Sequence, residues 1–157
     1  MSIYEKIEQD HANHRTLLNK LVETEGDSED RRRLWKAFYY DVKAHAAAEE
    51  ETFYSKLMED PDGQDDARHS VAEHKEMDDI MEELQSMDFS NPGWLTRFKT
   101  LKHDYEHHIE EEENEIFAKG RDVFDENEAA RIGERFDERK LAERDLVDEK
   151  AEQSLDE

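Results

Sequence analysis

The chain contains no cysteine, which excludes disulfide bonds, cysteine-ligated zinc sites and thiol chemistry. Its 157 residues include only five glycines and two prolines, so few residues would break a helix. No apolar run approaches 18 residues, and we expect no membrane-spanning helix. The N-terminal segment lacks the basic and apolar regions of a secretory signal. We therefore expect a cytoplasmic protein.

Negative charge dominates the composition of the chain. Charged residues make up 43% of the chain, and the formal net charge is −23. This charge repels nucleic-acid phosphates and anionic lipids, so we expect neither nucleic acid nor membrane as a partner. An acidic surface also attracts cations, although a solvated acidic coat is the simpler interpretation. Few breakers and short aliphatic runs favour a single all-α domain.

Apolar residues recur at helical spacing in four long stretches, at about 2–24, 29–58, 64–87 and 92–119. A shorter fifth helix is predicted at roughly 126–147. Short loops between long helices favour antiparallel neighbours in up-down-up-down order. Gly120 is expected to end the fourth helix, and the last ten or so residues, acidic and almost without apolar side chains, are expected to be disordered. The chain then divides into a bundle at 1–120 and a C-terminal segment at 121–157.

The second half of the chain repeats a His-x3-Glu motif of the first half with an offset of 63 residues. His45 and Glu49 form the first copy, and His108 and Glu112 form the second. Residues four apart on a helix point about 40° apart and lie about 6 Å apart along the axis, so each pair stacks on one face. Two ions a few ångströms apart suit this repeated stacking, with each histidine on one ion and each carboxylate bridging both.

Two lone histidines, His11 and His74, share the same offset and complete the set. All of these side chains fall where a core leucine would otherwise lie, and burying them unpaired would cost several kcal/mol each. Taken singly, each is more simply a hydrogen-bonded core residue or a chance pairing; taken together, they favour a two-metal site. The candidate metal ligands are His11, His45, Glu49, His74, His108 and Glu112.

This order and spacing of lone histidines and His-x3-Glu-Glu segments resembles the hemerythrin-type HHE cation-binding domain, over about residues 3–120. The resemblance implies an antiparallel up-down-up-down four-helix bundle. It also implies a non-haem di-iron centre in which the four histidines are terminal ligands and the two glutamates are bridges. The sequence leaves manganese and zinc open as alternatives to iron.

One departure from the oxygen-carrying branch of this family is informative. Those carriers have two histidines one turn apart on the third helix, whereas Ser70 lies one turn before His74 here. His69 points about 100° away, and His14 remains open as a fifth ligand or as a hydrogen-bond partner of a ligand. The chain therefore looks more like the four-histidine members, which are associated with iron handling or with oxygen, nitric oxide and peroxide stress.

The register on the fourth helix needs a choice between two histidines. His107 and Glu111 have the same spacing as His108 and Glu112, so the motif alone does not decide. The offset of 63 residues selects His108, which also continues the apolar stripe, whereas His107 points about 100° off it.

Counting ligands suggests what such a centre could do. Two histidines and one oxygen from each carboxylate give each ion four ligands, and an oxo or hydroxo bridge makes five. Octahedral iron then keeps one open position, where O2, NO or peroxide could bind. The alternatives are a di-iron enzyme that degrades peroxide or donates iron for repair, and a metal-free helical scaffold. The sequence identifies no catalytic residue and leaves protein partners open.

Overall fold

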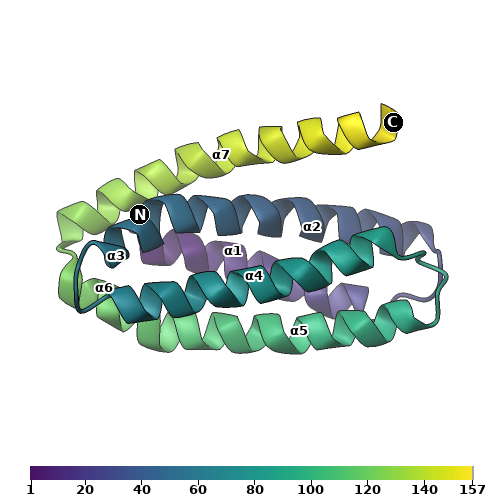
Figure 1. Cartoon of the computed structure of the whole chain (residues 1–157), viewed down its shortest axis with the longest axis horizontal. Helices are drawn as coiled ribbons and strands as arrows, with labels where there is room; N and C mark the ends of the chain where they lie inside the picture. The colour runs from purple at the N-terminus through teal and green to yellow at the C-terminus, as the bar shows by residue number, and fades with distance from the viewer. Residues whose placement is uncertain (157) are drawn as a thin grey trace.

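The computed structural model describes the backbone of residues 1–156 and the side chains of residues 1–146. Four antiparallel helical segments form a bundle, and a further helix packs along one side of it (Figure 1). In chain order the elements are α1 (Ile3–Leu21), α2 (Glu29–Glu49), the π-helical η1 (Glu50–Tyr54), α3 (Ser55–Met58), α4 (Gln64–Ser86), α5 (Gly93–Glu111), the π-helical η2 (Glu112–Ile116), α6 (Phe117–Val123) and α7 (Glu126–Asp156). The predicted all-α class and bundle are confirmed.

Local sequence sets the starts of the first two segments. The Ser2 hydroxyl accepts a hydrogen bond from the Glu5 amide, and the Ser28 hydroxyl accepts one from the Arg31 amide. Each serine satisfies an amide that would otherwise lack a partner in the first turn. α1 ends at Leu21, before the expected end near residue 24, and Gly26 supplies a left-handed turn with φ of +57° in the connection.

Two predictions about helix ends were wrong. Gly120 lies inside α6 and does not end it. A Cβ atom at this position would lie 2.7 Å from the Tyr4 hydroxyl, so the absence of a side chain at Gly120 lets Tyr4 of α1 pack closely against α6. The C-terminal helix was expected to stop near residue 147, but α7 is helical through Asp156. Its Glu, Ala, Arg and Lys content has high helix propensity, and the packed N-terminal part provides a nucleus. The tail that was predicted to be disordered is therefore helical through Asp156. Glu157 lies outside the described residues.

Apolar side chains gather in two separate clusters, one toward each end of the bundle. One cluster surrounds Trp35 and Phe98, and the other surrounds Phe53 and Phe117. α7 contributes Phe136 to the second cluster by packing on α1 and α2. Between the clusters lies a layer of buried histidine and glutamate side chains. The apolar clusters hold the backbone rigid on both sides of this polar layer.

Candidate metal centre

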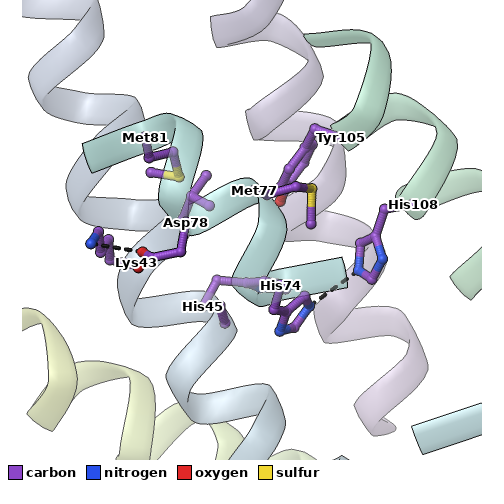
Figure 2. Close-up of a pocket in the computed structure, with 10 residues that line it drawn as sticks. Lys43, His45, His74, Met77, Asp78, Met81, Tyr105 and His108 are labelled. Atoms are coloured by element: carbon purple, nitrogen blue, oxygen red, sulfur yellow. Dashed lines mark hydrogen bonds and ion pairs between the residues drawn. The ribbon is translucent and has the colours of Figure 1, made fainter. Parts of the chain in front are cut away.

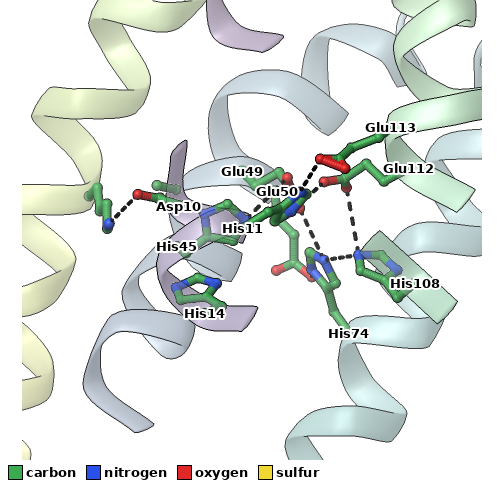
Figure 3. A network of polar contacts seen from close by, with 12 residues as sticks. Asp10, His11, His14, His45, Glu49, Glu50, His74, His108, Glu112 and Glu113 are labelled. Atoms are coloured by element: carbon green, nitrogen blue, oxygen red, sulfur yellow. Dashed lines mark hydrogen bonds and ion pairs between the residues drawn. The ribbon is translucent and has the colours of Figure 1, made fainter. Parts of the chain in front are cut away.

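The six predicted ligand residues meet in the polar layer, and each is at most 8% exposed. Each of the helices α1, α2, α4 and α5 supplies one of the four histidines (Figure 3). Glu49 ends α2, and Glu112 begins the π-helical segment η2. The side chains fall into two groups whose potential ligand atoms lie within 4.8 Å of one another, and both groups contain Glu49 and Glu112.

Glu49 reaches one histidine of each group. Its Oε2 atom lies 3.4 Å from Nε2 of His45, and its Oε1 atom lies 3.1 Å from Nε2 of His74. The two oxygens of one carboxylate are thus directed toward two different imidazoles. This is the arrangement that a carboxylate bridging two ions requires.

Glu112 repeats the arrangement from the other side of the layer. Its Oε1 atom lies 3.2 Å from Nε2 of His11, and its Oε2 atom lies 3.6 Å from Nε2 of His108. One group therefore contains His11 with His45, and the other contains His74 with His108, whose Nε2 atoms are 3.1 Å apart.

The charges of this layer are not balanced by hydrogen bonds. All four carboxylate oxygens of Glu49 and Glu112 are buried and lack a hydrogen-bond partner. Burial raises the pKa of Glu112, and the neighbouring charge of Glu49 raises it further. For Glu49, burial would raise the pKa, but His45 and His74 together outweigh this and hold it well below its ordinary value. Two cations would satisfy these unpartnered oxygens, so the residues fit a pair of metal ions.

The outward-facing nitrogens of the four histidines are each directed to a further carboxylate. The Nδ1 atom of His45 lies 2.7 Å from Asp10, and that of His108 lies 2.9 Å from Glu73. Because a carboxylate only accepts, Nδ1 donates its hydrogen, and whenever the ring is neutral its Nε2 lone pair points into the layer. Burial lowers the pKa of His45, but the Glu49 and Asp10 carboxylates raise it to about 9 in the metal-free protein.

The other two histidines also have a carboxylate beside Nδ1, but only His74 makes a hydrogen bond to it, and the buried Nδ1 of His11 has no hydrogen-bond partner. The Nδ1 atom of His74 lies 3.2 Å from Glu50, and that of His11 lies 3.5 Å from Glu113. The sequence analysis did not identify these orienting carboxylates. The signal was present: Asp10 and Glu73, like Glu50 and Glu113, are related by the same offset of 63 residues.

A π-helical turn lies at each of the two buried glutamates: η1 follows Glu49, and η2 begins at Glu112. The Ser55 amide bonds to the Glu50 carbonyl and the Phe117 amide to the Glu112 carbonyl, each five residues apart instead of four. Phe53 within η1 and Phe117 just after η2 both pack in the second apolar cluster. Single π turns inside α-helices often occur at functional sites. Helical periodicity in the sequence does not reveal them.

His14 is buried beside the layer, but both of its nitrogens already have partners. Its Nε2 donates to the Asp41 carboxylate at 2.6 Å, and its Nδ1 accepts from the Tyr105 hydroxyl at 2.6 Å. Burial lowers the pKa of His14 to about 4, in keeping with a neutral ring. In this arrangement His14 supports the layer through its ring contact with His45.

The remaining histidine alternatives lie outside the layer. The side chains of His69 and His107 are 54% and 67% exposed, whereas that of His108 is 3% exposed. The structure therefore places His108 in the cluster and leaves His107 on the surface.

A small cavity of about 30 Å³ adjoins the layer between α2, α4 and α5 (Figure 2). His45, His74 and His108 form its polar wall. Its other walls are mainly apolar and include Val42, Met77 and Met81; on one side lies an ion pair of 2.7 Å between Lys43 and Asp78. A cavity of about 10–15 Å³ on this measure holds one water molecule, so the cavity suits a ligand of two or three atoms.

None of the described helices contains an apolar stretch that could cross a bilayer. Comparison with solved structures shows similarity to the crystal structure of a hemerythrin HHE cation binding domain-containing protein from Mycobacterium kansasii. The TM-score is 0.83 at 23% sequence identity, covering 93% of this chain and 89% of that chain. This likeness supports the fold.

A second relative is a DNA nickase of Nostoc sp. (strain PCC 7120), which is 28% identical over 118 residues. The match covers 75% of this chain but 33% of the nickase, so this chain spans about a third of that protein's length. Residues 2–119 also match the family described as the hemerythrin HHE cation binding domain, over the segment that contains all six buried ligand candidates. The chain belongs to the hemerythrin HHE cation-binding domain family.

Proposed function

We propose that this protein holds two iron ions in the polar layer and binds O2, NO or peroxide beside them. One ion would be held by His11 and His45 and the other by His74 and His108. Glu49 and Glu112 would bridge the two. The observation that carries this proposal is the pair of buried carboxylates whose four oxygens have no hydrogen-bond partner. Imidazole and carboxylate ligands suit iron, and also manganese and zinc.

The cavity supports the choice of a small ligand. It reaches three of the four proposed ligand histidines, and the methionines on its wall offer no strong hydrogen bond. A bound iron pair supplies redox-active positions for a diatomic molecule or peroxide. The chain's own contribution is to orient the imidazoles through their Nδ1 carboxylates and to keep the pocket narrow and largely apolar.

One observation favours a second candidate function, turnover of peroxide. Tyr105 lines the cavity and donates its hydroxyl hydrogen to His14, which in turn donates to Asp41. This chain of hydrogen bonds could move a proton toward or away from the cavity. Reversible binding needs no such movement, so the two functions differ in their dependence on Tyr105.

The experiment is ligand binding by iron-loaded protein with the cavity open or filled. Ala46 lines the cavity and is half-buried. We expect Ala46→Phe to keep its iron but to weaken NO and azide binding at least tenfold. Binding is followed by the visible absorption that appears when the ligand is added to the iron-loaded protein. Ala46→Ser is the matched control and should bind like the wild type. Equal binding by all three proteins would refute the cavity as the ligand site.

Turnover is tested separately by peroxide consumption. Catalytic consumption of many equivalents by the wild type, reduced at least tenfold in Tyr105→Phe with iron content unchanged, would establish the enzyme. Stoichiometric reaction alone would establish binding.

We also propose that DNA nicking is not a property of this chain. The family segment, residues 2–119, has the same length as the 118-residue similarity to the nickase, which leaves two thirds of the nickase unmatched. The net charge of −23 opposes binding to DNA phosphates. We expect supercoiled plasmid to remain supercoiled after incubation with the iron-loaded protein; conversion to the open-circular form would contradict this.

A further inference from the structure

A second group of metal-ligand side chains lies on the outer face of α4 and α5. The Nε2 atom of His69 is 2.8 Å from Oε1 of Glu111 and 3.6 Å from Oε2 of Glu73. The potential ligand atoms of these three residues lie within 4.8 Å of one another. His107 adds a second imidazole, with Nε2 at 3.6 Å from the other oxygen of Glu111. The group thus combines two imidazoles with two carboxylates.

The backbone positions suit chelation of one ion. His69 and Glu73 are one helical turn apart on α4, and His107 and Glu111 are one turn apart on α5. A transition-metal ion lies about 2.0–2.2 Å from each ligand, so its ligand atoms lie within roughly 4.4 Å of one another. The ligand atoms of His69, Glu73 and Glu111, all within 4.8 Å of one another, lie close to that range.

The internal repeat shows what occupies the equivalent face of the first half. Asp10 is the counterpart of Glu73, and each orients one histidine of the buried layer. On that face α7 brings Lys140 to 2.9 Å from Asp10, and Lys6, the counterpart of His69, pairs with Asp137. A fixed positive charge therefore compensates Asp10.

Within residues 1–146, whose side chains the structure describes, no such cation compensates the second half. α7 packs on α1 and α2 and leaves the outer face of α4 and α5 uncovered (Figure 1). Among the described side chains, no lysine or arginine lies within 4.0 Å of the carboxylates of Glu73 or Glu111. His69 and His107 are mostly exposed, so an ion could reach them from solvent without any helix moving.

We propose that His69, Glu73 and Glu111, with His107 beside them, form a separate divalent transition-metal site on this face. The bound ion supplies the positive charge that Lys140 supplies on the opposite face. Imidazole and carboxylate together select ions such as Zn²⁺, Mn²⁺ or Fe²⁺ over Ca²⁺ and Mg²⁺, which prefer oxygen alone. Because the site is exposed and its ligands are weakly held, its ion exchanges far more readily than the buried pair.

The test is equilibrium dialysis of the iron-loaded protein against Zn²⁺ in physiological salt, which screens the general acidic surface. Zinc and iron are both counted by elemental analysis. The test variant is His69→Ala combined with His107→Ala, two substitutions at exposed helix positions. His103→Ala is the matched control, because His103 is an exposed histidine of α5 outside the group. We expect one zinc per chain in the wild type and the control, at least tenfold weaker zinc binding in the double variant, and unchanged iron in all three.

Equal zinc affinity in the double variant and the wild type would overturn the proposal, as would zinc uptake matched by equal iron loss. The comparison does not depend on the buried pair being iron. If the chain fails to hold iron, the double variant and the wild type still share the same six buried residues, and a difference in zinc binding between them still reports the outer site.

Discussion

The carboxylates of Glu49 and Glu112 meet in the middle of the bundle, with ligand oxygens within 4.8 Å of each other and no hydrogen-bond partner on any oxygen. Two acidic groups so placed repel each other and lose hydration, which destabilises a metal-free fold. With two ions bound, each glutamate would hold both of them through its two oxygens. Stability without metal and affinity for metal are therefore opposed in this layer.

We therefore expect Glu112→Gln to maintain or raise the stability of the metal-free protein and to lower the stability gained when metal binds. The substitution keeps the side-chain volume but removes the acidic group whose pKa burial raises. We expect the metal-free variant to be at least as stable as the metal-free wild type in urea. With iron at about a hundredfold its dissociation constant, the wild type should gain about 3 kcal/mol that the variant lacks.

The matched control is Glu110→Gln on the exposed side of α5. It should keep the full iron content and the full gain in stability. If Glu112→Gln also keeps both, Glu112 does not bridge two ions.

The second prediction concerns adjacent histidines on α5. His108→Ala should lose at least one iron per chain, because it removes an imidazole from the buried layer. His107→Ala should keep both ions and a normal visible spectrum, since its side chain is 67% exposed. Elemental analysis of the two purified variants checks this. The reverse result would move the second bridge from Glu112 to Glu111.

The third prediction concerns the carboxylate that orients His45. Asp10→Asn should weaken iron binding roughly 10–100-fold, because the charged acceptor that fixes the imidazole is lost. A competition titration against an iron chelator measures the change. Glu8→Gln, an exposed substitution on the same helix, should leave the affinity unchanged. An unaltered affinity in Asp10→Asn would show that the contact only stabilises the fold.

The sequence alone predicts part of this site. The repeat offset predicted six residues that the structure brings together in one buried layer, because positions related by the offset lie at equivalent places in the two halves of the bundle. Their role as metal ligands stays a prediction. The offset did not reveal the docking of α7, since that helix lies outside the repeat. The pairing of Lys140 with Asp10, and its absence beside Glu73, therefore had to come from the structure. The π turns and the close approach at Gly120 also depend on packing between segments distant in sequence.

The fourth prediction concerns pH. Burial lowers the pKa of His14 to about 4 in the folded protein, from an ordinary 6.5. The unfolded chain therefore binds more protons between these values, and stability falls as the pH drops from 6.5 toward 4. This difference corresponds to about 3 kcal/mol.

Urea unfolding of the metal-free wild type and of His14→Gln between pH 4.5 and 7.5 measures this loss of stability. The wild type should lose more stability than the variant as the pH falls. Parallel pH dependence in the two proteins would mean that His14 is protonated in the fold or that its contacts differ.

The most direct test of the whole account is the number of iron ions per folded chain after reconstitution and removal of loosely held metal by a chelator. The two sets of ligand atoms that share Glu49 and Glu112 predict two ions per chain. A value of one or less in fully folded protein would contradict the proposed di-iron centre.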